Sequence, residues 1–157
     1  DPEMARGLGD VYKRQDQEFD NVIFSFNGLM LLESYEERLS AVKEVCRLLK
    51  DDGKFIFTTP YLDNKVKKSY WSEKAETLGI DTGNMSWEQQ LELGDEQLED
   101  YGSEFYLHVP FISEVEQMLE EAGMELLFSA RRLDYSGIEK MEDELDDNYL
   151  WVTTCKK

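Results

Sequence analysis

The fold is decided by the stretch Phe19–Phe26, with the sequence FDNVIFSF, which ends at the polar pair Asn27-Gly28. The stretch is short and rich in aromatic and β-branched residues, a composition that predicts a β-strand. It is apolar almost throughout, which is typical of a strand buried on both faces in a parallel sheet covered by helices. We therefore expect an α/β fold around this strand.

A helix and a second strand are predicted next. Ser34-Tyr35-Glu36-Glu37 has the S-x-x-E pattern of a capping box, in which a hydroxyl and a carboxylate satisfy the first free N–H groups of a helix. The apolar residues that follow at helical spacing are Leu39, Val42, Val45, Cys46 and Leu49. Gly53 suits the left-handed position that ends a helix. Lys54–Tyr61 (KFIFTTPY) is predicted to be a second buried strand, which Pro60 stops.

A polar insertion, at residues 62–105, comes after the second strand. Between Leu62 and Glu104 there are eleven acidic and four basic residues. The apolar pattern is loose there, and a short helix is predicted near Ser86–Leu93.

The last third of the chain predicts a helix and two strands. Ser113-Glu114-Val115-Glu116 repeats the S-x-x-E cap, and Gly123 is expected to end the helix that follows. Strands are predicted at Met124–Arg131 and Tyr149–Cys155, on either side of the acidic stretch Asp134–Asp147. We expect that stretch to be a solvated face.

The order of these elements predicts the topology. Strands that alternate with amphipathic helices imply right-handed crossovers and a mostly parallel sheet. No apolar helix separates the last two strands, so they can form a long antiparallel hairpin.

Composition narrows the classes of partner. The 157 residues carry a formal net charge of −18, and a surface so acidic repels phosphate backbones and anionic lipids. No apolar run approaches the roughly 20 residues that span a bilayer. We therefore expect no nucleic-acid partner and no membrane partner. Cys46 and Cys155 match no metal or redox spacing, which predicts two buried thiols and a cytoplasmic location.

Residues 1–15 are expected to be foreign to the protein. Within them, Arg6–Gln15 (RGLGDVYKRQ) resembles an in-frame translation of the transposon-end adapter used in sequencing libraries. Segments of this kind are excluded from fold reasoning. The natural sequence would then begin near Asp16, and an ordinary flexible tail is the alternative.

The order of motifs resembles the second half of a class I S-adenosylmethionine-dependent methyltransferase. Phe19-Asp20-Asn21-Val22-Ile23 resembles the F-D-x-V-I of the family's fourth strand. Leu48-Leu49-Lys50-Asp51-Asp52-Gly53 resembles the L-K-P-G-G that ends its next helix, with Asp51-Asp52 in place of Pro-Gly. The resemblance implies a three-layer Rossmann-like sheet, mostly parallel with an antiparallel last strand. It also implies S-adenosyl-L-methionine as methyl donor and, given the acidic surface, a small-molecule acceptor.

The resemblance fails at the front of the family's domain. Methyltransferases of this class hold the donor with a Gly-rich turn after their first strand, and no G-x-G-x-G occurs here. Gly7-Leu8-Gly9, the nearest candidate, follows no predicted strand. We therefore expect an N-terminally truncated domain that lacks part of its donor site.

Candidate site residues follow from the rule that ligands bind beyond the carboxyl ends of such strands. The resemblance implies that the donor pocket is lined at Ser25, Phe26, Asn27 and Gly28. The alternative is a buried aromatic ring at Phe26 and an asparagine that caps its own turn. The N-P-P-Y signature of base-amino methyltransferases is absent here, which again disfavours DNA as substrate.

The acceptor is expected at the next strand end and in the insertion. Thr59 and Tyr61 would face the acceptor, or would simply form a strand end turned by proline. Trp71 would cover the substrate, or belong to a small core of the insertion. His108 is the only histidine, and its imidazole titrates near neutrality, so it is the candidate catalytic base.

Two other functions stay open at this point. One is a non-catalytic, acidic α/β interaction module that binds a basic partner. The other is a dinucleotide-linked α/β enzyme, which shares the fold logic but has no fingerprint in this sequence. The methyl acceptor, the atom methylated and the oligomeric state are left open.

Overall fold

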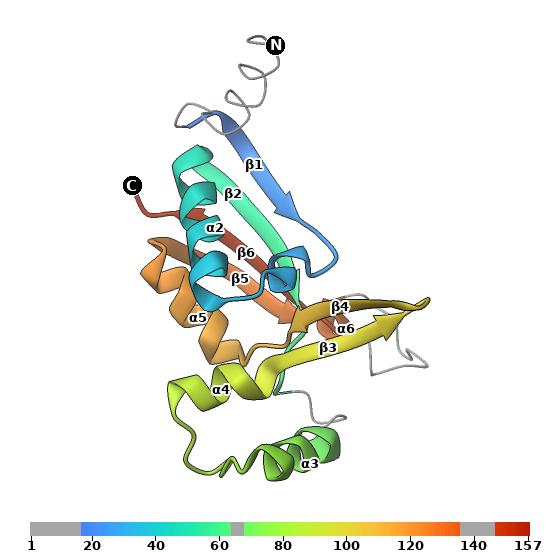
Figure 1. The fold of residues 1–157 in the computed structure, drawn as a ribbon. Helices are drawn as coiled ribbons and strands as arrows, with labels where there is room; N and C mark the ends of the chain where they lie inside the picture. Colours follow the sequence, from blue (N-terminus) through green and yellow to red (C-terminus); the bar gives the residue numbers. More distant parts are fainter. Residues whose placement is uncertain (1–16, 64–67, 136–146) are drawn as a thin grey trace, which may run out of the picture.

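A computed structural model describes residues 17–63, 68–135 and 147–157. The elements in chain order are β1 (Phe19–Phe24), the 3-10 helix η1 (Gly28–Leu31), α2 (Tyr35–Leu48), β2 (Leu49–Thr59), α3 (Lys68–Leu78), α4 (Trp87–Gly94), β3 (Asp95–Asp100), β4 (Ser103–His108), α5 (Ile112–Glu121), β5 (Met124–Arg131), α6 (Arg132–Tyr135) and β6 (Tyr149–Cys155) (Figure 1). No helix within these ranges is long and apolar enough to cross a bilayer. The segment 1–15 and residues 136–146 of the acidic stretch lie outside the described residues.

The main sheet has four strands in the order β1-β2-β6-β5. β1 is parallel to β2, whereas β6 is antiparallel to both β2 and β5. Three strands therefore run in one direction and the last strand opposes them. This confirms the predicted mixed α/β sheet and the antiparallel hairpin of the last two strands. β5 and β6 have the predicted bounds, and β1 ends two residues earlier than expected.

One face of this sheet is covered by α2 and α5, which lie side by side across it (Figure 1). The buried core between these helices and the sheet consists of Leu29, Met30, Tyr35, Val42, Leu49, Phe55, Phe57, Val115, Met118, Leu119, Ala122, Met124 and Trp151. This layer gives the sheet its rigidity, because the alternate residues of β2 and β6 point into it.

The opposite face carries an apolar row that runs across all four strands. Ile23 pairs with Ile56, Ile56 pairs with Val152, and Val152 pairs with Phe128. At the two ends of the row, Ile23 is 68% exposed and Phe128 is 48% exposed. The described residues thus supply a sheet and one helical layer, and the third layer of the expected three-layer fold stays a prediction.

The connection between α2 and β2 differs from the prediction. α2 ends at Leu48 and β2 begins at Leu49, and the left-handed residue is Asp52, with φ 63°, instead of Gly53. A Cβ on Gly53 would lie 2.9 Å from the carbonyl oxygen of Lys50 and 3.0 Å from that of Asp20. Gly53 therefore permits β1 and β2 to approach each other closely, which is a different role from ending a helix.

The two predicted capping boxes have different outcomes. Ser34 caps α2 as predicted, because its Oγ accepts from the backbone N–H of Glu37 at 3.1 Å. α5 begins before Ser113, and its N-cap residue Phe111 has no capping side chain. Asp63, which is distant in sequence, instead accepts from the backbone N–H of Ile112 at 2.8 Å. The second cap prediction was wrong because a tertiary contact replaces the local one.

The insertion contains more regular structure than the sequence indicated. α4 forms as predicted, with a complete capping box between Ser86 and Gln89. α3 and the antiparallel hairpin β3–β4 were not predicted. The hairpin turns at Tyr101-Gly102, with φ 49° and 78°, the positive φ values that a two-residue hairpin loop requires. A second, smaller core holds the insertion together, with Leu62, Trp71, Ala75, Ile80, Leu93 and Val109 buried in it.

The expectation of two free thiols was wrong. Cys46 of α2 and Cys155 of β6 form a disulfide, with Cα atoms 5.2 Å apart and a sequence separation of 109. The sequence spacing gave no sign of this bond, because only the packing of α2 across the end of β6 brings the two residues together. The bond removes the reduced thiols on which the cytoplasmic location was based, and that location stays a prediction.

Candidate functional site

The carboxyl ends of β1, β2 and β5 meet at one edge of the main sheet, and antiparallel β6 begins there. Figure 1 shows that α3, α4 and the β3–β4 hairpin lie beyond this edge. Open α/β sheets bind ligands at this edge, because loops rather than strands line it. The edge and the insertion beyond it are therefore the candidate functional site.

The loop after β1 is held in place by Asn27. Its backbone N–H donates to Thr58 Oγ1 at 3.2 Å, and its side-chain Nδ2 donates to Asn148 Oδ1 at 3.1 Å. Asn27 thus links β1 to the end of β2 and the start of β6. Asn27 Oδ1 is buried and has no hydrogen-bond partner among the described residues. A buried acceptor without a partner is costly, so this atom is suited to a ligand's donor.

The rest of the loop is shaped by its backbone. Phe26 and Asn27 are left-handed, with φ 53° and 57°, and Phe26 is 93% exposed. The alternative of a buried ring at Phe26 is therefore wrong. The N–H of Gly28 donates to the carbonyl of Ser25 at 3.1 Å, and a Cβ on Gly28 would lie 2.7 Å from Cδ1 of Phe24. The loop is tight and presents an aromatic side chain to solvent.

Thr59 and Tyr61, the predicted acceptor contacts, are both buried. Thr59 Oγ1 accepts from Trp151 Nε1 at 3.0 Å, and the hydroxyl of Tyr61 donates to Asp147 Oδ2 at 2.6 Å. Burial and this hydrogen bond to a carboxylate raise the pKa of Tyr61. The two side chains join the end of β2 to β6, and their contact with an acceptor stays a prediction.

His108, the predicted base, lies at the end of β4 and is fully buried. Its Nδ1 lies 2.8 Å from Asp95 Oδ1, and its Nε2 lies 2.9 and 2.8 Å from the two carboxylate oxygens of Glu114. Burial alone would lower the pKa of His108, but the hydrogen bonds to Asp95 and Glu114 outweigh it and raise the pKa. Both ring nitrogens contact carboxylates, and a role of His108 as catalytic base stays a prediction.

Arg38 of α2 extends this buried group. Its Nη1 donates to the carbonyl of Leu32 at 2.7 Å and to the hydroxyl of Tyr106 at 3.3 Å, and that hydroxyl donates to Asp95 Oδ1 at 2.6 Å. Burial and the contact with Asp95 raise the pKa of Tyr106 to about 12. We call Arg38, Asp95, Tyr106, His108 and Glu114 the buried polar network. It ties the hairpin to both α2 and α5.

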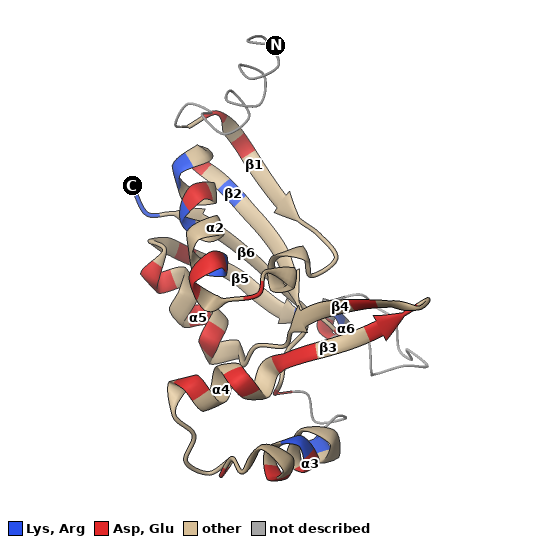
Figure 2. Cartoon of the chain, in the orientation of Figure 1, with Lys and Arg blue, Asp and Glu red and all other residues tan. Residues whose placement is uncertain are grey.

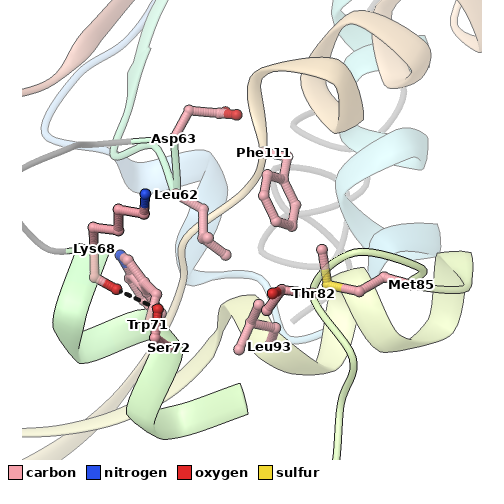
Figure 3. A pocket seen from close by; sticks show the side chains of 9 residues that line it. All are labelled: Leu62, Asp63, Lys68, Trp71, Ser72, Thr82, Met85, Leu93 and Phe111. Carbon is pink, nitrogen blue, oxygen red and sulfur yellow. Dashed lines mark hydrogen bonds between the residues drawn. The ribbon is translucent and has the colours of Figure 1, made fainter. Parts of the chain in front are cut away.

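A cavity of about 350 Å³ lies in the insertion (Figure 3). Its lining comes from the segment after β2, from α3, from the turn before α4, from α4 itself and from the N-cap residue of α5. The lining residues are Leu62, Asp63, Lys68, Trp71, Ser72, Thr82, Met85, Leu93 and Phe111. Of the predicted site residues, the cavity includes Trp71 alone.

Sequence reasoning missed the rest of the cavity and most of the buried polar network. The sequence did contain a sign of the buried polar network, because Arg38 and Glu114 occupy positions on the apolar faces of their helices. A charged residue on such a face needs a buried partner. The sequence contained no such sign of the cavity, because the cavity depends on how α3 and α4 pack. The described residues contain no group of three His, Cys, Asp or Glu side chains that could hold a metal ion.

Similarity to solved structures, and not similarity in sequence, supports the fold assignment. No protein-family model matches the sequence, and no curated protein matches it. A SAM-dependent methyltransferase from Methanosarcina mazei is similar in structure, with a TM-score of 0.63 and 14% identity, over 91% of this chain and 62% of that one. The CcbJ methyltransferase from Streptomyces caelestis is also similar, with a TM-score of 0.59 and 17% identity, over 92% of this chain and 64% of that one.

A third similar structure is the 1,6-didemethyltoxoflavin-N1-methyltransferase of Burkholderia thailandensis, with bound 1,6-didemethyltoxoflavin and S-adenosylhomocysteine. Its TM-score is 0.55 at 10% identity, over 92% of this chain and 47% of that one. The chain therefore has a class I SAM-dependent methyltransferase-like fold. It spans less than two thirds of the length of each of these three proteins.

Proposed function

We propose that this chain is the C-terminal part of a S-adenosylmethionine-dependent methyltransferase that acts on a small-molecule acceptor. The observation that carries the proposal is the strand order β1-β2-β6-β5 with β6 reversed, in a chain whose structural neighbours are methyltransferases. The small-molecule acceptor is supported by the bound 1,6-didemethyltoxoflavin in one neighbour. None of these matches favours the alternative of a non-catalytic acidic module.

The donor is proposed to bind against Ser25, Phe26, Asn27 and Gly28. The buried Oδ1 of Asn27, which has no hydrogen-bond partner among the described residues, supports this. It can accept a hydrogen bond from the cationic amino group of the methionine part of S-adenosylmethionine. The two hydrogen bonds of Asn27 to the neighbouring strands fix that oxygen in place. When bound, the donor supplies the methyl group, and the loop contributes orientation.

The proposal includes a truncation, so that an upstream part of the domain completes the sheet. Ile23 is 68% exposed on β1, which is an edge strand of the described sheet, and the apolar row from Ile23 to Phe128 is only partly covered. An uncovered apolar edge favours aggregation, and an additional strand and helices would bury it. Residues 1–15 are proposed to be adapter-derived, so this upstream part would replace them.

His108 is proposed to act as a positioning residue. Because both ring nitrogens contact carboxylates, it holds the hairpin β3–β4 against α5 instead of contacting the reacting atoms. The methyl acceptor is proposed to bind near Thr59, Tyr61 and Trp71. Of these, Trp71 lines the cavity of the insertion.

Isothermal titration with S-adenosylhomocysteine tests the function, on this chain and on a chain in which the natural upstream sequence replaces residues 1–15. We expect weak or no binding by this chain and clear binding by the longer one. Asn27→Ala in the longer chain should weaken binding about tenfold, since a charge-assisted hydrogen bond is lost. Asn84→Ala, at an exposed loop position, serves as the matched control. No binding by the longer chain would remove the proposed function.

A further inference from the structure

The cavity of the insertion has a donor-rich corner on α3. Lys68 and Trp71 are three residues apart on this helix, so their side chains lie on the same face. Figure 3 shows Nζ of Lys68 and Nε1 of Trp71 on the same side of the cavity. Both atoms are hydrogen-bond donors and neither is an acceptor.

The indole N–H of Trp71 lacks a hydrogen-bond acceptor among the described residues. The side chain is only 6% exposed, and its Nε1 is buried without a hydrogen-bond partner among the described residues. A buried N–H that lacks an acceptor costs stability, and tryptophan usually finds a partner when it is buried. A ligand with an acceptor atom would supply that partner.

The charges around the corner favour an anionic acceptor atom. Lys74, the other cation described on α3, is already used, because it pairs with Glu96 at 3.4 Å and lies 5.5 Å from the Trp71 ring centroid. No described acceptor contacts Nζ of Lys68. Asp63 is the one carboxylate in the lining, and its Oδ2 is bound to the N–H of Ile112 at the start of α5.

The remaining walls are apolar and partly aromatic. The apolar lining residues are Leu62, Met85, Leu93 and Phe111, and Ser72 and Thr82 add two hydroxyl groups (Figure 3). Flat apolar groups pack well against such walls, and a volume of about 350 Å³ is near the small end of ligand pockets, which range over about 300–1,000 Å³. Figure 2 shows Asp and Glu along α4, α5 and β3, and both signs of charge on α3. Lys68 is the one cation among the residues that line the cavity.

We propose that this cavity binds a small planar, apolar acceptor that carries an anionic oxygen group, and that Lys68 Nζ and Trp71 Nε1 donate to that oxygen. The substrate class is an aromatic or heteroaromatic acid. This inference rests on the proposed function for its biological meaning, since it names the acceptor of the same enzyme. Leu62, in the lining of the cavity, lies three residues beyond the end of β2, so this part of the lining follows directly from the edge of the main sheet.

The test uses three probes of one shape and different charge: 2-naphthoate, 2-naphthalenemethanol and 2-naphthylmethylamine. Binding to the full 157-residue chain is followed by NMR at the indole N–H signals of the three tryptophans, Trp71, Trp87 and Trp151. We expect the signal that Trp71→Phe removes to shift most, and 2-naphthoate to bind about tenfold more tightly than the alcohol or the amine.

Matched variants decide the role of the charge. Lys68→Met should reduce the affinity for 2-naphthoate about tenfold and leave that for the alcohol nearly unchanged. Lys156→Met, which removes an exposed lysine paired with Glu120, should change neither. Equal affinity for all three probes, preference for the amine, no binding, or insensitivity to Lys68→Met would each overturn the inference. No methyl donor is used, so this result is independent of the S-adenosylhomocysteine titration.

Discussion

His108 Nε2 lies 2.9 and 2.8 Å from the two carboxylate oxygens of Glu114, and this buried contact joins the hairpin of the insertion to α5 of the main domain. Glu114 is 2% exposed and His108 is fully buried. The pair lies between Asp95 on β3 and the body of α5, so it fixes the position of the hairpin beside the main sheet.

Removing the charge of Glu114 should destabilise the protein strongly. In Glu114→Gln the buried imidazolium loses one carboxylate partner, and breaking a buried pair typically costs about 3–5 kcal/mol. The free energy of unfolding, measured by urea denaturation, checks this prediction. Glu116→Gln, two residues along the same helix and exposed, is the control and should change stability little. Equal effects of the two substitutions would contradict the role given to the buried pair.

The stability of the protein should depend on pH through His108. Its pKa is raised in the folded protein, so its stabilising contribution is fully present below the ordinary histidine pKa of 6.5. That contribution is lost as the pH rises through the raised, folded-state pKa. The groups that face the ring are Asp95 on β3, Glu114 on α5 and Arg38 on α2.

A series of urea denaturations on the alkaline side of pH 6.5 measures this loss. The free energy of unfolding should fall with rising pH in the unsubstituted chain, and His108→Gln should make that part of the curve flatter. An unchanged slope in His108→Gln would show that other groups cause the dependence.

For Asp95 the dependence of stability on pH has the opposite sign and is expected at acid pH. Burial by itself raises the pKa of Asp95, but hydrogen bonds from His108 and Tyr106 outweigh it and lower the pKa, so its contribution is lost as the pH falls.

The disulfide between Cys46 and Cys155 should be detectable without a structure. Thiol titration of the unfolded chain, without reductant, should find no free thiol in the described cysteines. Reduction should lower the melting temperature, since closing a loop of this order is worth about 4.7 kcal/mol in the chain-entropy model. Cys46→Ser is the control, because its melting temperature should not respond to reductant. Two free thiols in the untreated chain would contradict the bond.

Substitution of Gly94, at the end of α4, should destabilise the protein. A Cβ at this position would collide with the carbonyl oxygen of Val109 and lie 2.8 Å from Cε1 of His108. Gly94→Ala should therefore cost about 1–3 kcal/mol of stability and disturb the position of His108. Gly83→Ala is the control, since its nearest contact is 3.3 Å away at Asp81 Oδ1. Thermal denaturation of both variants checks the difference, and equal melting temperatures would contradict it.

The parts of the fold that local sequence determines could be predicted. β5 and β6 have the predicted bounds, Ser34 caps α2 as predicted, and α5 ends before Gly123, which has a left-handed φ of 75°. For Gly123 the prediction was the end of the helix, and its left-handed φ is a finding of the structure. Each of these features depends on residues within a few positions of one another. Apolar runs and caps act at that range, so the chain alone displays them.

The parts that depend on distant contacts could not be predicted. Asp63 caps α5 from 49 residues away, and Cys46 meets Cys155 across 109 residues. The hairpin β3–β4 was missed because β3 (DEQLED) is acidic and has low β propensity, and its pairing with β4 stabilises it. The candidate site divides in the same way: the loop at Asn27 could be proposed from a strand end, whereas the cavity around Trp71 depends on the packing of α3.

The most direct test of the account is a crystal structure of the chain extended by its natural upstream sequence, with S-adenosylhomocysteine bound. We expect an added strand beside β1, helices over the apolar row from Ile23 to Phe128, and the ligand's amino group on Asn27 Oδ1. A sheet that still ends at β1, or a ligand bound away from residues 25–28, would contradict it.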